Sequence, residues 1–509
     1  MPDTITTAAA KPPIFVGTAT PMLLAAPTTS QEDVREKTFS AGVTSGEILF
    51  TAGKPVAYAL QQRIAELDAQ LSAGVTQVLH DPAFQKLEAS WRGLQGLVMS
   101  TDTGDMLKLR VLNATAAELY DDLSNAIDRD QSALFKKLYE EEYGTFGGNS
   151  YSVLLFDHEF GRRIAVGSVA PELSSTEEME LATMLSGVAA AAHAPVIAAA
   201  DPSLFDPQWT DYTRLGMPRD LSKIFESIDM SHWSDLRESE DSRYLTLVLP
   251  RVLMRLPYGA DSLTETGTVP VAGMDFDELA QGLEHKDYLW GTAVWALGQQ
   301  ITTAFSLYGW CAAIRGVEGG GLVEGLPLHT FTTPAGDMVA KIPTEVAITD
   351  RREKELNDLG FIALCYQKGT DSACFFGGAT VQKPQVYTVP AASANAQASS
   401  LLPYVLAASR FAHYIKQIGR EKVGSFQTRT GLEKYLNNWI ADYVLLNDDA
   451  PQSAKAAYPL REARIDVTEV PGQVGAYNAT VFLRPHFQLE ELTASIRLVA
   501  QLPPPATAA

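Results

Sequence analysis

The sequence predicts a mixed α/β fold with more than one domain. Residues 151–156 (YSVLLF) and 195–200 (PVIAAA) have the apolar composition of buried strands. Between them, Ser174 and Glu177 form a capping box that starts an Ala-rich helix ending near His193. A strand–helix–strand order of this kind favours parallel pairing in an α/β layer. The length of 509 residues indicates two or three domains.

Shifts in composition divide the chain into three parts. Residues 1–56 are rich in Thr, Ala, Pro and Ser without sustained periodicity, which predicts a flexible arm that contains a β-prone patch at 46–51 (GEILFT). Residues 57–385 are expected to form the main α/β domain, and residues 386–509 a C-terminal domain of helices and a β-hairpin. The Pro-, Ala- and Ser-rich stretch 384–400 marks the boundary between these two domains.

In the first third of the chain, a helical pattern begins at residue 57. Asp81 and Pro82 are a typical helix start, with Asp as the N-cap and Pro in the first turn. Residues 107–112 (LKLRVL) alternate like a half-buried strand. An apolar stripe at helical spacing, predicted to face the core, comprises Phe84, Leu87, Trp91, Leu94 and Val98.

The remaining elements follow from the same patterns. Helices are predicted over residues 218–230, 288–310, 400–420 and 430–444, and strands over 361–366 and 373–376. Near the C-terminus, residues 463–470 and 477–484 alternate on either side of a Pro-Gly turn, which predicts a hairpin. Residues 492–500 alternate again, so a third strand is expected there.

Three consecutive glycines, Gly319, Gly320 and Gly321, follow the long apolar helix and lie between Glu318 and Glu324. Only glycine reaches positive φ without strain, so the run predicts a tight turn or the close approach of another backbone. The spacing matches neither the P-loop nor the G-x-G-x-x-G pattern, and the two carboxylates would repel a phosphate. Packing or an interface is therefore favoured over nucleotide binding.

Charge and cysteine content exclude several classes of function. A net charge of -21 and a pI near 4.8 argue against nucleic acid or an anionic membrane as a partner. Cys311, Cys365 and Cys374 lie in apolar sequence without C-x-x-C spacing, which predicts buried thiols in a reducing compartment. Neither a transmembrane span nor a signal peptide is evident. We expect a cytoplasmic protein that does not insert into a membrane.

No constellation of catalytic residues stands out. His158 precedes a Glu but lacks the second histidine of H-E-x-x-H, and no G-x-S-x-G elbow is present. His413 and His486 each lie near an Arg and aromatic residues, and a structural role in the core is favoured for both. We expect no catalytic residue, no metal and no cofactor. The alternative is an enzyme in which Glu318 and Glu324 act as paired carboxylates.

Five long blocks of the sequence resemble one known family. They are DPAFQKLEASWRGLQGLV, YGWCAAIRGVEGGGLVEGLP, PTEVAITDRREKELNDLGFIALCY, LPYVLAASRFAHYIK and LRPHFQLEELTASIRLVAQLP, and the resemblance runs from about Val56 to Pro503. The blocks are similar to those of the large sheath subunit of the bacterial type VI secretion system, the TssC/VipB (EvpB) family. Only the N-terminal arm lies outside the resemblance.

This resemblance implies a structural protein whose fold is partly shared with phage tail sheaths. Large subunits of the family pair with a small sheath subunit (TssB/VipA), and the heterodimers stack as hexameric rings around a tube of Hcp. Contraction of the sheath, which is docked on a membrane-anchored baseplate, expels the tube, and the ClpV ATPase then disassembles the sheath. The sheath of a related phage-tail-like contractile injection particle is the alternative.

The resemblance also suggests where subunits meet, because neighbouring protomers of the family exchange strands. A C-terminal hairpin has the open edges that β-augmentation uses. The candidate buried face of that shared sheet comprises Ile465, Val467, Val481 and Leu483, and the turn Gly319, Gly320 and Gly321 is a further interface candidate. Basic residues that are candidates for contact with the tube are Arg351, Arg352 and Lys354, or Lys416, Arg420 and Lys422.

Overall fold

The computed structural model describes residues 56–164, 171–259, 276, 278, 284–333, 335–423, 425, 428–447, 449–471, 476–486 and 488. The chain divides into two compact units, Met1–Ala73 with Gly273–Asp275, and Gly74–Ala272 with Phe276–Ala509. The described part of the first unit belongs to helix α2 (Val56–Leu79), which begins where the helical pattern predicts. The predicted arm before residue 56, its patch at 46–51 and the third strand at 492–500 lie outside the described residues.

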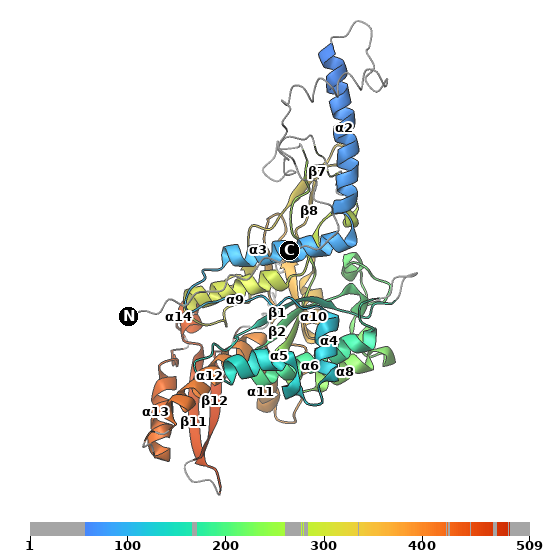
Figure 1. The fold of residues 1–509 in the computed structure, drawn as a ribbon. Coiled ribbons are helices and arrows are strands. Elements are labelled where there is room, and N and C mark those ends of the chain that lie inside the picture. The colour runs from blue at the N-terminus through green and yellow to red at the C-terminus, as the bar shows by residue number, and fades with distance from the viewer. Residues whose placement is uncertain are drawn as a thin grey trace, which may run out of the picture. The chain divides into compact units, whose positions relative to one another are not determined.

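A six-stranded mixed sheet forms the centre of the second unit (Figure 1). Its order is β1 (Leu154–Phe160), β2 (Val196–Ala200), β3 (Leu245–Leu249), β9 (Phe361–Tyr366), β10 (Ala373–Phe375) and β6 (Leu322–Val323). The first four strands run parallel, and β10 pairs antiparallel with both β9 and β6. The predicted mixed α/β class is confirmed.

The two faces of this sheet bury separate cores. Val196, Ala198 and Ala200 face one core, which includes α6 (Ser175–Ala192) and α8 (Ser231–Glu238). Ile197 and Ala199 face the other, which includes α9 (Val294–Tyr308). Figure 1 shows α6 and α9 on opposite sides of the strands. Because both faces are covered, the inner parallel strands β2, β3 and β9 are almost wholly apolar, as the sequence of β2 predicts, while the edge strand β1 also contains Asp157, His158 and Glu159.

Helix α6 begins and ends as its sequence predicts. The Ser174 hydroxyl accepts a hydrogen bond from the backbone N–H of Glu177 at 3.3 Å, and the Glu177 carboxylate accepts one from the N–H of Ser174 at 2.7 Å. His193 closes the helix in the left-handed region, with φ of 50°. The predicted capping box is therefore confirmed, and it fixes the helix between β1 and β2.

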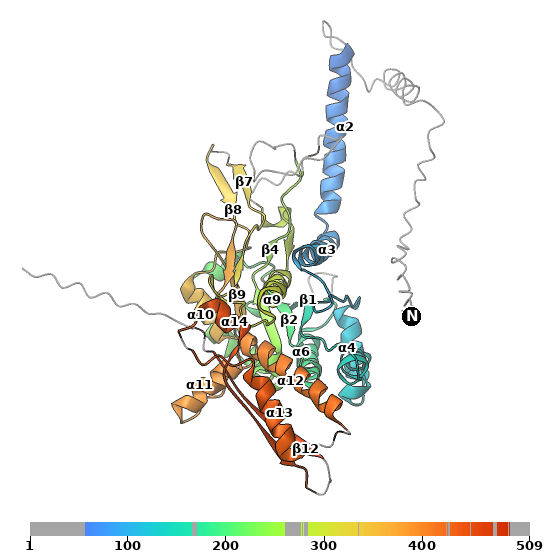
Figure 2. The same cartoon turned by 90° about the vertical axis from the view of Figure 1, so that its left-hand side faces the viewer.

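A third core lies at the C-terminal end of the chain. It joins α12 (Leu402–Lys422), α13 (Arg429–Ala441) and a hairpin of β11 (Leu460–Glu469) and β12 (Tyr477–Pro485). Trp310, just after α9, stacks on Phe411 of α12 with ring centroids 4.5 Å apart. Figure 2 shows α12, α13 and the hairpin gathered at one end of this unit. The predicted helices and hairpin of this region are confirmed.

Helix α3 (Pro82–Ser100) has Asp81 as its N-cap, as predicted, but the face that it buries is not the predicted one. The apolar stripe expected to face the core is largely exposed, with Trp91 59% and Leu87 47% accessible. The helix packs on α9 through its small residues, because Gly93 lies against the indole of Trp295. The prediction from side-chain size therefore identified the wrong face of α3, because the close contact with α9 requires glycine and not a large side chain at the interface.

Two further expectations are wrong. Residues 107–112 form no strand, and Val111 is 70% exposed. Residues 218–230 do not form one helix, but break into α7 (Ser222–Phe225) and a 3-10 turn at Ile228–Met230.

The other helices are α4 (Ala116–Asn125), α5 (Ala133–Phe135), α10 (Asp350–Asp358), α11 (Pro390–Ser399) and α14 (Gln452–Ala457), a π-helix at Lys136–Tyr143, and 3-10 turns at Arg129–Gln131, Pro202–Leu204, Thr213–Gly216, Asp241–Tyr244 and His285–Asp287. The other strands are β4 (Val252–Leu253), β5 (Trp290–Gly291), β7 (His329–Thr332) and β8 (Met338–Lys341).

None of the helices in the described ranges combines the length and the apolar character that crossing a membrane requires.

Candidate functional site

The C-terminal hairpin is the candidate site for assembly. Strands β11 and β12 pair antiparallel in a register that is regular from Glu462 to Glu469, after one irregularity between Leu460 and Glu462, and that places Ile465 opposite Val481 and Val467 opposite Ala479. In such a pair, opposite residues alternate between bonding each other and pointing their N–H and C=O groups outward. The hairpin forms a two-stranded sheet of its own, so its two outer edges decide what it can bind.

One face of the hairpin is filled by the same chain. Ile465 and Val467 are buried, and Val481 and Leu483 are half-buried, in the core that α12 and α13 line. The four side chains named from the sequence thus lie together and pack against this chain's own helices. A partner would have to bind along an edge of the hairpin, where the backbone is accessible.

The outer edge of β11 is closed by side chains of α13. The amide of Asn437 accepts a hydrogen bond from the N–H of Ile465 at 3.0 Å and donates one to its C=O at 2.7 Å. Arg429 donates to the C=O of Val467 at 3.0 Å. At the start of the strand, the N–H of Leu445 donates to the C=O of Leu460 at 2.8 Å. Figure 1 shows α13 alongside β11 with β12 beyond it.

Among the residues that the structure describes, none is bonded to the outer edge of β12. Both the N–H and the C=O of Ile465 bond the side chain of Asn437, so these two groups point away from β12. Ile465 and Val481, which lies opposite it, therefore form a pair whose backbone N–H and C=O groups point outward from the hairpin. By alternation, the backbone groups that point away from β11 on β12 are those of Tyr477, Ala479, Val481 and Leu483. Within the described part of the chain, no hydrogen bond to these outward groups is present. Within the described ranges, the hairpin thus has its β11 edge closed and its β12 edge without a bonded neighbour.

The three glycines form a tight turn that is bonded to the central sheet. The N–H of Phe375 in β10 donates to the C=O of Gly321 at 2.9 Å, and Gly320 has φ of +85°. A Cβ at Gly319 would lie 2.1 Å from the C=O oxygen of Arg315, and one at Gly321 would lie 2.6 Å from that of Phe375. Close packing of the backbone within the chain thus explains the glycines.

The basic residues proposed for contact with a tube are in different environments. Arg351 is exposed at the start of α10. Arg352 is buried, and its guanidinium donates to the C=O of Arg219 at 2.8 Å and of Met217 at 2.5 Å. Of this pair, only Arg351 therefore presents its charge at the surface.

Lys416 lies in an aromatic cage. Its Nζ is 3.5 Å from the ring centroid of Tyr143 and donates to the hydroxyl of Tyr139 at 3.1 Å. This cage binds α12 to the π-helix that holds both tyrosines, and it withdraws much of the ammonium from solvent.

Comparison with known proteins places the chain in a family. A model of the EvpB tail sheath N-terminal domain matches residues 61–382, and a model of the EvpB tail sheath gpW/gp25-like domain matches residues 391–502. The chain belongs to the VipB (EvpB) tail sheath family. Together the two models cover most of the chain, including the C-terminal hairpin.

One curated relative and two remote structural neighbours are described by name. The chain is 45% identical over 450 residues to the type VI secretion system sheath protein TssC1 of Pseudomonas aeruginosa (strain PAO1), covering 87% of this chain and 86% of the relative. Remote structural likeness is found to a chain of the anti-feeding prophage baseplate (9% identity, TM-score 0.34, covering 63% and 66% of the two chains). The contracted PVC sheath complex of an extracellular contractile injection system is similarly remote (6% identity, TM-score 0.33, covering 62% and 68%).

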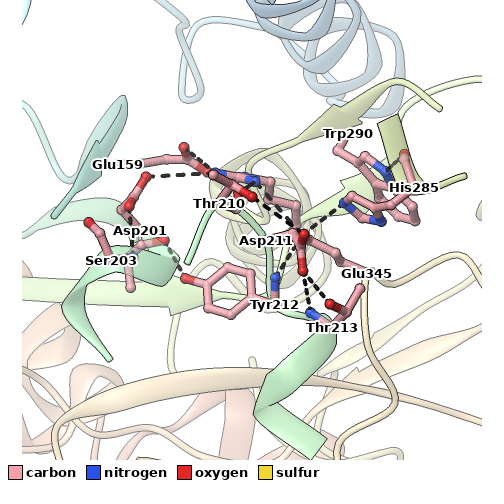
Figure 3. Close-up of polar contacts among 12 residues, drawn as sticks. Glu159, Asp201, Ser203, Thr210, Asp211, Tyr212, Thr213, His285, Trp290 and Glu345 are labelled. Carbon is pink, nitrogen blue, oxygen red and sulfur yellow. Dashed lines mark hydrogen bonds and ion pairs between the residues drawn. The ribbon is translucent and has the colours of Figure 1, made fainter. Parts of the chain in front are cut away.

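In this member of the family, the carboxyl ends of the parallel strands carry a cluster of charges (Figure 3). Arg251, just after β3, donates twice to Glu159 of β1, at 2.6 and 2.9 Å. Arg163 forms an ion pair of 2.6 Å with Asp201, just after β2. In many α/β proteins this edge of the sheet binds a ligand. Here the carboxylates that reach it are held in ion pairs with arginine.

The electrostatics of the cluster indicate that the ion pairs are stable. Burial alone would lower the pKa of Arg251, but the neighbouring Glu159, Glu345 and Asp201 raise it well above its ordinary value. The carboxylate of Glu345 also accepts a hydrogen bond from the N–H of Tyr212 at 2.9 Å and forms a 3.0 Å pair with His285. These ion pairs and hydrogen bonds connect five segments of the chain, so the cluster has a structural role.

The remaining candidates for chemistry also have structural roles. His158 pairs with Glu178 of α6 at 2.8 Å instead of forming part of a metal motif. His413 is buried and bonds the C=O of Ala192 at 3.0 Å, so the structural role predicted for it is confirmed. Burial raises the pKa of the Cys374 thiol to about 12, which keeps it protonated and unreactive. No metal-binding group of His, Cys, Asp and Glu occurs among the residues that the structure describes.

Sequence reasoning missed Asn437, which closes one edge of the hairpin. Its only local signal is that asparagine is a poor helix former in the middle of α13. Its partner Ile465 is 28 residues away, so the contact depends on the tertiary packing of α13 on β11.

Proposed function

We propose that this chain is the large subunit of the contractile sheath of a type VI secretion system. Membership of the tail sheath family and the 45% identity to a type VI sheath protein support this assignment. In this role it is a structural protein without catalysis, and it works in the cytoplasm. It assembles with copies of itself and with the small sheath subunit (TssB/VipA) in hexameric rings around the Hcp tube.

The observation that carries the proposal is the outer edge of β12, to which no described residue is bonded. A soluble monomer with no further partner normally covers or twists an exposed strand edge to prevent unwanted pairing. Here the β11 edge is closed by Asn437 and Arg429, while the β12 edge exposes outward backbone groups from Tyr477 to Leu483. A strand donated by a neighbouring protomer would complete this sheet through main-chain hydrogen bonds.

A second surface supports association with a helical partner. Helix α2 carries apolar residues at heptad spacing, and Ile64, Leu67, Leu71 and Val78 are each between 41% and 56% exposed. A spacing of three and four residues is the pattern by which two helices interlock in a coiled coil. We assign this seam to a helix of the small sheath subunit.

The other partners follow from the family role. The exposed guanidinium of Arg351 is our candidate for contact with the Hcp tube, and the domain boundary near residue 385 separates the main sheath domain from the assembly domain. The sheath docks on the baseplate, and the ClpV ATPase disassembles it after contraction. The turn at Gly319, Gly320 and Gly321 remains an interface candidate through the residues that it positions.

The decisive experiment blocks the β12 edge without touching the core. Ala479 has an exposed side chain and an outward N–H, so Ala479→Pro removes one donor and puts a ring carbon where an added strand would lie. The variant is co-expressed with the small sheath subunit, and tubules are counted by negative-stain electron microscopy. We expect heterodimers in normal yield but no tubules.

The matched control is Ala479→Thr, which keeps the N–H and favours an extended strand. Tubules should form with this variant as with the wild-type chain. Wild-type numbers of tubules from Ala479→Pro would show that the β12 edge is not used. Failure of the wild-type pair to form tubules would contradict the sheath assignment as a whole.

A further inference from the structure

Asn437 of α13 contacts the centre of β11 with both ends of its side-chain amide. The N–H of Ile465 donates to its Oδ1 at 3.0 Å, and its Nδ2 donates to the C=O of Ile465 at 2.7 Å. The same Nδ2 donates to the C=O of Glu433 in the preceding turn of α13 at 2.8 Å, which fixes the orientation of the amide. Asn437 is half-buried, whereas the next residue, Asn438, is exposed.

The two bonds to Ile465 are the ones that a residue of an added strand would form. In an antiparallel pair, two opposite residues of the hydrogen-bonded kind exchange two N–H···O=C bonds. A side-chain amide has the same kinds of donor and acceptor as a peptide group. Asn437 therefore occupies the backbone groups that an additional strand along β11 would need.

The middle of this edge is held by two side chains. The alternation of the register places outward backbone groups at Ala463 and Val467 as well as at Ile465. Arg429 donates to the C=O of Val467 at 3.0 Å. Within the described ranges, no bond from another element reaches the backbone of Ala463 on this edge. Access to the centre of β11 thus depends mainly on Asn437 and Arg429.

The sequence of β11 is complementary to itself in one antiparallel register. When two copies are aligned with Ile465 opposite Ile465, Arg464 lies opposite Asp466. Arg461 then lies opposite Glu469, and each pair occurs twice because the arrangement is two-fold symmetric. Opposite charges at cross-strand positions favour pairing. Within one chain Arg464 and Asp466 form an ion pair of 2.9 Å, so two copies could exchange these partners without leaving a charge alone.

We propose that Asn437 prevents a second copy of this chain from pairing along β11. Its amide bonds the two groups of Ile465 that lie at the centre of the self-complementary register, and a second copy would have to displace it. A strand edge that is accessible to its own kind causes unwanted association. This role concerns the β11 edge alone, and it depends neither on what binds along β12 nor on the proposed function.

Cross-linking between copies detects the self-complementary register directly. In that register Glu462 of one copy lies opposite Thr468 of the other, at a pair without mutual hydrogen bonds. Both residues are exposed, and within one chain about 20 Å of extended strand separates them. A full-length chain with Glu462→Cys and Thr468→Cys can therefore join these two positions by a disulfide only between copies. The dimer is measured on a non-reducing gel after air oxidation of the complex with the small sheath subunit.

Asn437→Ala in this double-cysteine chain should raise the yield of cross-linked dimer about tenfold, because Ile465 loses both bonds to the amide. Asn438→Ala is the matched control. It makes the same change one residue away, on an exposed position of the same helix, and should leave the dimer yield unchanged. An equal dimer yield from the two variants would overturn the proposal.

A charge reversal separates specific pairing from association of unfolded chains. Asp466→Arg, added to Asn437→Ala, places Arg464 opposite another arginine and should return the dimer yield to its low level. Further addition of Arg464→Asp exchanges the two charges and should restore the dimer. A dimer yield that responds to neither change would show that the copies associate through another surface, and would refute the role assigned to Asn437.

Discussion

His413 shows how a single buried side chain links stability to pH. Its ring lies in the core between α12 and the end of α6, where Nε2 bonds the C=O of Ala192. Burial lowers the pKa of His413 to about 4, and the positive charges of Arg410 and Lys416, with His193 nearby, add to the effect. The same burial lowers the pKa of His193. Both rings are therefore neutral in the folded chain at neutral pH.

We predict that neutral His413 makes the fold sensitive to mild acid. Its pKa in the folded chain, about 4, lies below the ordinary value of 6.5, so its contribution is complete above pH 6.5 and is lost as the pH falls towards 4. The difference corresponds to about 3 kcal/mol. Urea unfolding of the wild-type chain and His413→Gln between pH 7 and pH 4 should show a shallower decline for the variant, and parallel declines would contradict the assignment.

At this scale the sequence predicts the type of role but not the partner. The neighbours of His413 in the chain, an arginine and aromatic residues, favour a structural histidine, and the structure agrees. Asn437 and Gln488 have no such signal, because each bonds a main-chain group that is 28 or 176 residues away. The partner of an amide side chain that bonds a distant main-chain group can be identified only when the packing of the helices and strands is known.

The contact between α3 and α9 depends on the absence of a side chain. A Cβ at Gly93 would lie 2.2 Å from the indole of Trp295, and one at Gly96 would lie 3.0 Å from the amide of Gln299. The two glycines allow the helices to approach closely, so that α9 is covered on the side away from the sheet. This packing also leaves the large apolar residues of α3 exposed.

We predict that Gly93→Ala destabilises the chain by about 1–3 kcal/mol, because the methyl group collides with the half-buried indole of Trp295. Gly74→Ala is the matched control. Gly74 also lies inside a helix, but a Cβ added there would meet nothing within 4 Å, so alanine should stabilise α2 by up to about 1 kcal/mol. Thermal unfolding of both variants measures the contrast, and equal effects would refute the packing argument.

Among whole elements, those defined by local signals are predicted well. The capping box of α6, the Asp-Pro start of α3 and the alternation of β11 and β12 each depend on a few neighbouring residues, and each is found. Orientation is predicted less well. The exposed face of α3 and the irregular 107–112 segment result from which surface the rest of the chain covers, and that is a property of tertiary packing.

At the scale of the whole molecule, α2 is the surface on which association with the small sheath subunit is most easily tested. We predict that Leu67→Lys, in the apolar seam, lowers co-purification of the small subunit at least about tenfold, because the charge would be buried in the helix contact. Ala69→Lys adds the same charge on the far side of the helix and should have little effect. Equal loss in both variants would point to charge alone.

The closure of β11 by Asn437 has a consequence for how an assembly is connected. A hairpin whose β11 edge is closed can take an added strand only along β12, and under the proposed exchange each copy also supplies a single strand. Links of this kind join subunits into rows that do not branch. A row that does not close on itself then ends with one unfilled edge and one unused strand, so its two ends differ and its growth has a polarity.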